Sequence, residues 1–139
     1  MRWFCERALI GGLLAAIVGC GSTPARSVTG EQTFATHCAS CHGAGGAGDG
    51  PVAVTLKVAV PDLRTLCERS GGEFPVDRVA SYIDGRAMPA VHGARSMPVW
   101  GPVFQATNDM IRGADRPEER IEALIAHLLE LQSGCGGAG

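Results

Sequence analysis

Cys38-Ala39-Ser40-Cys41-His42 is the stretch of the sequence on which the predicted fold depends. Two thiols three positions apart, followed at once by an imidazole, form the C-x-x-C-H pattern that attaches a c-type haem. Each thiol can form a thioether with one porphyrin vinyl group, and the adjacent imidazole then reaches the iron as its proximal ligand. We therefore expect one covalent haem c, attached through Cys38 and Cys41 and ligated by His42.

The C-x-x-C part of the motif alone also suits a thioredoxin-like redox site or half of a zinc ribbon. The first needs a βαβ pattern, and no stretch alternates convincingly with period two. The second needs another Cys/His pair at ligand spacing, which the sequence lacks. The glycine-rich stretch 43–51 lacks the G-K-[ST] ending of a phosphate-binding loop, so it indicates a turn that passes close over a flat ligand.

Composition and charge limit the possible classes of protein. The chain has 139 residues, of which 45% are hydrophobic, so one packed domain with flanking segments is expected. Its formal net charge of −2 argues against nucleic acid as a partner, because such binding needs a concentrated basic face.

Residues 1–19 are typical of an export signal, with basic residues before an apolar run over 8–18. This run is too short to span a bilayer. It ends in a lipobox-like sequence at Cys20, which predicts a lipoprotein held in the bacterial cell envelope and facing the periplasm. Residues 20–28 would then be a flexible tether. The alternative is an ordinary secretory signal in which Cys20 is incidental.

Helical patterns predict an all-α fold, with helices over 29–40, 62–69, 76–84 and from Pro117 to Gly134. Thr29 and Gln32 have capping-box spacing at the start of the first helix, and Asp115 and Glu118 have it before the last. The segment between residues 85 and 115 is predicted to be a long loop, rich in Gly, Pro and Met, which a haem edge would order.

These features together resemble the class I monohaem cytochromes c, over roughly residues 28–133. The matching features are the helix entering Cys38-x-x-Cys41-His42-Gly43, the glycine-rich turn to Pro51, a Met-Pro dipeptide and the amphipathic C-terminal helix. The resemblance implies about four helices wrapped around one haem, with long irregular loops. It gives a cytochrome c domain over 29–135 and a disordered tail over 136–139.

The resemblance also implies a ligand set. His42 would be the proximal iron ligand and Met97 the distal one, while the carbonyl of Pro51 would accept the Nδ1 hydrogen of His42. Gly30 and Phe34 would mark the place where the first and last helices cross. Such proteins often carry an aromatic residue on the partner helix, where this chain has His127.

Spacing leaves the sixth ligand open. Met88-Pro89 is a second Met-Pro pair, His92 would give bis-histidine ligation, and Met110 lies further along the chain. A Met-Pro site is favoured because a thioether is a soft ligand and the proline stiffens its loop. Trp100 either closes the haem edge or packs in the core.

Other residues have less specific interpretations. Cys67 and Cys135 are assigned neither to the lipid nor to the haem. They either form a disulfide in an oxidising envelope or stay as free thiols. His37 is expected on a helix surface and His127 in packing. Arg86 and Arg95 are expected to be solvated charges, although either can contact a haem propionate.

The preferred function is a single-electron carrier, not an enzyme, because His/Met ligation leaves no open position on the iron. We expect its partners to be a membrane-bound redox donor and acceptor, beside the membrane that holds its lipid anchor. A second hypothesis is an electron-relay subunit of a larger oxidase, reductase or dehydrogenase complex. A third is a haem enzyme or gas sensor with an open sixth position.

Overall fold

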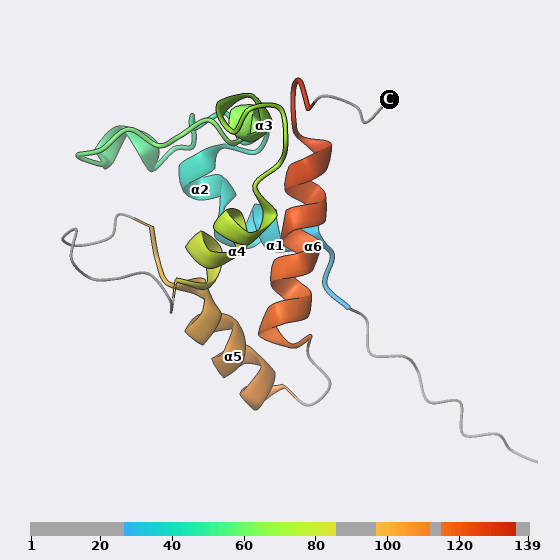
Figure 1. Cartoon of the computed structure of the whole chain (residues 1–139). Coiled ribbons are helices and arrows are strands. Elements are labelled where there is room, and N and C mark those ends of the chain that lie inside the picture. Colours follow the sequence, from blue (N-terminus) through green and yellow to red (C-terminus); the bar gives the residue numbers. More distant parts are fainter. Residues whose placement is uncertain (1–26, 86–96, 112–114, 136–139) are drawn as a thin grey trace, which may run out of the picture.

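The computed structural model describes residues 27–85, 97–111 and 115–135, and within these ranges it contains helices and no strands. This confirms the predicted all-α fold. Figure 1 shows α6 as the long helix beside which the others gather, with α1 passing behind it and α4 in front of α1. The helices are α1 (Gly30–His37), α2 (Ala39–His42), α3 (Leu66–Arg69), α4 (Val76–Asp84), α5 (Trp100–Met110) and α6 (Pro117–Glu130), with 3₁₀ turns at Ala53–Thr55 and Leu63–Thr65.

The crossing of α1 and α6 lies at Gly30 and Phe34, where the resemblance places it. The side chains of Thr29 and Gln32 form the predicted capping box at the start of α1. A Cβ atom on Gly30 would collide with the backbone carbonyl of Ala123 in α6, so only glycine permits this approach. One turn along α1, the Phe34 ring lies 5.2 Å from the ring of His127, centroid to centroid.

α6 begins at Pro117, as predicted, but the residue that caps it differs from the prediction by one position. The expected capping pair, Asp115 and Glu118, does not form: Arg116 precedes the helix, and its backbone N–H donates to the carboxylate of Glu119 at 3.0 Å. Pro117 takes the first helical position, which its fixed φ suits, and this shifts the cap forward. Asp115 instead accepts a hydrogen bond from the backbone N–H of Val28 at 2.7 Å, which ties the domain's first residues to α6.

The prediction of one long loop between residues 85 and 115 is wrong for residues 100–110, which form α5. Gly101 and Pro102 conceal the helix in the sequence, yet both lie in its first turn, where proline is tolerated. Phe104 is 1% exposed and anchors α5 in the core. Residues 86–96 lie outside the described residues.

The remaining predicted helices are close to those observed. α4 agrees with the predicted bounds, buries Val79 and Ile83, and ends at Gly85 in the left-handed conformation. The helix predicted over 62–69 is divided into a 3₁₀ turn and α3, and the helix predicted over 29–40 is interrupted at Cys38. None of the described helices is long and apolar enough to cross a membrane.

Cys67 and Cys135 form a disulfide, one of the two alternatives that the sequence left open. Cys67 lies on α3 and is fully buried, and its partner lies after the end of α6. The bridge closes a loop with a sequence separation of 68, for which the chain-entropy model gives a stabilisation of about 4 kcal/mol. The C-terminal end of the described chain is therefore fastened to the segment around α3.

Candidate cofactor site

The glycine-rich turn folds back onto the end of α2, which carries the second cysteine and the histidine of the motif. Its backbone N–H groups donate to the last carbonyls of the helix, from Gly48 to His42 at 2.8 Å and from Gly50 to Cys41 at 3.2 Å. A Cβ atom on Gly50 would collide with the carbonyl of Cys41, so this close approach needs glycine. The turn thus satisfies the carbonyls that α2 leaves unpaired and fixes the end of this short helix.

Two adjoining cavities of about 430 and 290 Å³ lie beside the motif. Apolar side chains from four helices line the larger one, among them Phe34, Val79 and Leu124. Trp100 and the segment around Val58 line the smaller one. The residues that line both cavities are Cys38, His42, Pro61, Tyr82 and Met97.

The expectation that the carbonyl of Pro51 receives the Nδ1 hydrogen of His42 is wrong in this structure. The Nδ1 atom lies 3.4 Å from the carbonyl oxygen of Pro61 instead, which makes a long hydrogen bond. Pro51 lies at the exposed end of the turn after α2. The next residue, Val52, donates its backbone N–H to the carbonyl of Ser40 and so holds this end of the turn against α2. The acceptor is therefore the proline that precedes the 3₁₀ turn, ten positions later in the chain than expected.

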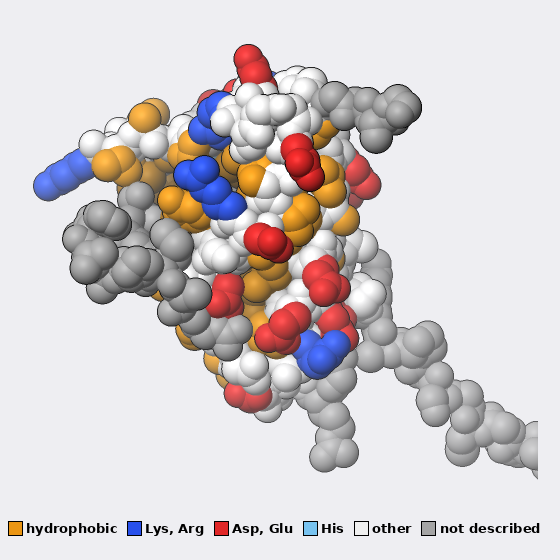
Figure 2. All heavy atoms as spheres, viewed as in Figure 1, with side chains coloured by type: hydrophobic (Ala, Val, Ile, Leu, Met, Phe, Trp, Pro, Cys, Tyr) orange, Lys and Arg blue, Asp and Glu red, His pale blue; other side chains and the backbone are white. Residues whose placement is uncertain are grey.

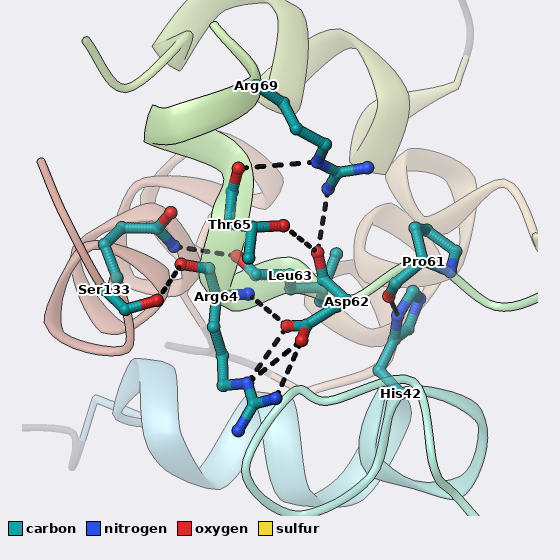
Figure 3. A network of polar contacts seen from close by, with 9 residues as sticks. His42, Pro61, Asp62, Leu63, Arg64, Thr65, Arg69 and Ser133 are labelled. Carbon is teal, nitrogen blue, oxygen red and sulfur yellow. Dashed lines mark hydrogen bonds and ion pairs between the residues drawn. The ribbon is translucent and has the colours of Figure 1, made fainter. Parts of the chain in front are cut away.

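The segment that carries Pro61 is held by the residues that follow α6 (Figure 3). The side chain of Gln132 donates to the carbonyl of Leu63 at 2.8 Å and accepts from the backbone N–H of Cys67 at 3.1 Å. The backbone N–H of Ser133 donates to the carbonyl of Arg64 at 2.9 Å. Sequence reasoning did not find these supports, since a single glutamine after a helix carries no recognisable signal.

Burial shifts the acid–base behaviour of the motif. Desolvation lowers the pKa of His42, and the hydrogen bond to Pro61 offsets part of this shift. Desolvation raises the pKa of the Cys38 thiol to about 11, with a smaller contribution from Cys41. Reactive dithiols have lowered thiol pKa values, so the opposite shift here argues against a thioredoxin-like function.

The other candidate residues divide into three groups. Met97 lines both cavities and Trp100 lines the smaller one, whereas Met110 is 85% exposed and lines neither. His37, expected on the surface, lines the smaller cavity and packs against the rings of Trp100 and Phe104, at centroid distances of 5.1 and 5.6 Å. The candidates that lie outside the described residues are Cys20, Arg86, Met88, His92 and Arg95.

The donor groups and the walls of the cavities fit a haem. His37 also lines the smaller cavity. At the edge of the apolar space stand two thiols, together with the imidazole of His42 and the thioether of Met97. These are the groups that covalent attachment and axial ligation of haem c require. Within the described ranges, no cluster of three or more His, Cys, Asp and Glu side chains could hold a bare metal ion.

Comparison with known families agrees with this chemistry. A family model described as Cytochrome c matches residues 27–132. The chain belongs to the cytochrome c family. Members of this family bind haem c covalently, and the haem supplies a reversible one-electron change at its iron. No curated protein and no solved structure matches this cytochrome c.

Proposed function

We propose that this cytochrome c is a single-electron carrier of the bacterial cell envelope. It holds one haem c through Cys38 and Cys41, with His42 and Met97 as the axial ligands. The observation that carries this proposal is that His42 and Met97 line the same two cavities as Cys38. With side chains of the chain in both axial positions, no substrate can bind the metal, so electron exchange is the remaining chemistry.

Exposed apolar residues beside the smaller cavity support contact with a redox partner. Val58 lines this cavity and is 51% exposed, and Val54 in the neighbouring 3₁₀ turn is 89% exposed. This segment extends away from the helices in Figure 1. Electron exchange needs only close approach of a donor and an acceptor, which such a surface permits.

The proposed location rests on the sequence before the domain. We propose that Cys20 carries the lipid and that residues 20–28 tether the domain to the membrane surface. More than one acyl chain is needed for durable anchoring, which lipidation of an N-terminal cysteine supplies. Release of a Cys20→Ser variant from the membrane fraction, with the wild type retained there, tests this part.

The function itself is tested on the full chain, matured with haem. We expect one haem per chain in a pyridine haemochrome assay and a single reversible one-electron wave in an equilibrium redox titration. The double variant Cys38→Ala/Cys41→Ala serves as the matched control and should lose its haem under denaturing conditions. More than one haem per chain, or high-spin iron in the oxidised wild type, contradicts the proposal.

A further inference from the structure

Two arginines line the larger cavity and have no acidic partner there. Arg69 lies at the end of α3 and Arg78 lies on α4. Both are exposed, and none of the described residues that line this cavity is acidic. Figure 2 shows Lys and Arg side chains standing beside apolar ones near α3, while Asp and Glu side chains gather over α6. The solvent edge of this cavity is therefore positively charged.

The two guanidinium groups have hydrogen-bonding capacity left for a ligand. Arg69 donates to two backbone carbonyls, those of Asp62 at 2.8 Å and Thr65 at 3.4 Å. Its charge also acts on the Asp62 carboxylate, but that carboxylate forms its ion pair with Arg64 at 2.7 Å. Arg78 makes no hydrogen bond or ion pair with any described residue. By contrast, Arg116 pairs with the carboxylate of Glu119 at 2.9 Å.

An apolar cavity with two cations at its edge suits a flat apolar ligand that carries two carboxylates on one side. Guanidinium groups bind carboxylates through paired N–H donors, and long side chains can lie along an apolar wall with their charge in water. We propose that Arg69 and Arg78 form a site for the propionate carboxylates of the haem. This inference rests on the proposed function.

Arg69 also connects this site to the proximal histidine (Figure 3). Its guanidinium holds the carbonyl of Asp62, and the preceding residue, Pro61, offers its carbonyl to Nδ1 of His42. A carboxylate bound to Arg69 is therefore linked, through one short backbone segment, to the group that orients the imidazole. Arg69 is a positioning residue for His42 as well as part of the carboxylate site.

The test compares Arg78→Gln and Arg69→Gln with Arg116→Gln as the matched control, all in the haem-loaded full chain. The readouts are the propionate bending modes in resonance Raman spectra and the midpoint potential. We expect both site variants to shift these modes. We also expect them to change the ratio of reduced to oxidised protein at a fixed potential by roughly three- to tenfold towards the oxidised form. Arg116→Gln should change neither readout.

Two further variants and measurements separate charge from geometry. Arg78→Lys keeps the charge but loses the paired N–H donors. Its midpoint potential should therefore be closer to that of the wild type than its propionate bending modes are. Only Arg69→Gln should also move the paramagnetically shifted haem methyl resonances, which report the orientation of the axial imidazole.

The failure of this inference is distinguishable from that of the proposed function. A wild type without His/Met spectral features contradicts the proposed function. Variants that keep these features, with unchanged propionate modes and potential, overturn the carboxylate site alone. An effect confined to the salt dependence of electron exchange with an acidic partner protein also overturns it, because the arginines would then serve docking.

Discussion

The Nδ1 atom of His42 lies 3.4 Å from the carbonyl oxygen of Pro61, and the C-terminal residues hold the segment that supplies this carbonyl. The proximal side of the cavity therefore depends on contacts between parts of the chain that are about half its length apart. The hydrogen bond that orients a metal-binding histidine also affects its basicity as a ligand.

Gln132 is the side chain that joins the two segments, so its removal should weaken both stability and orientation. In Gln132→Ala, the N–H of Cys67 and the carbonyl of Leu63 lose their partner, which should cost about 1–3 kcal/mol in the free energy of unfolding. Urea unfolding of the haem-loaded protein measures this. Gln105→Ala is the control, because Gln105 donates to Asp109 on an exposed face. Equal effects of the two substitutions would contradict the bridging role.

The disulfide between Cys67 and Cys135 should contribute about 4 kcal/mol to the free energy of unfolding. Denaturant unfolding of Cys67→Ala/Cys135→Ala, compared with the oxidised wild type, measures this contribution. The visible spectrum of the double variant should stay that of a low-spin haem, because neither cysteine lines the cavities. A loss of the low-spin spectrum would show instead that the disulfide is needed to hold the haem site.

Gly30 should tolerate no side chain, because its Cα faces the backbone carbonyl of Ala123. Gly30→Ala must push α1 away from α6, and we expect a destabilisation of about 1–3 kcal/mol in thermal or denaturant unfolding. Gly45→Ala is the matched control, since a Cβ atom there meets nothing within 4 Å. If both substitutions were neutral, the close crossing of the two helices would be refuted.

His37 should make stability depend on pH. Desolvation first, and the nearby charge of Arg120 second, lower its pKa below the ordinary value of 6.5. The unfolded chain therefore takes up the proton first, so the stabilisation is complete above pH 6.5 and declines as the pH falls towards the lower folded pKa. Between pH 7.5 and 5, the wild type should lose more stability than His37→Gln. Parallel pH profiles of the two proteins would contradict this.

The sequence was most informative where a local pattern determines the structure. Periodicity and flanking glycines predict α4, because this helix depends on residues close together in the chain. The helix crossing at Gly30 and Phe34 is implied by the resemblance to the cytochromes c. α5 was missed because Gly101 and Pro102 conceal its start. The resemblance implies Pro51 as the acceptor for His42, and only the folded chain shows that the carbonyl of Pro61 reaches the ring instead.

The identity of the sixth ligand is the point on which the proposed carrier depends. The most direct measurement is the red-region absorption band of the oxidised protein, which arises from charge transfer between methionine sulfur and ferric iron. The band should be present in the wild type and in Met88→Ala, and it should vanish in Met97→Ala. A band that persists in Met97→Ala would show that another residue occupies the sixth position.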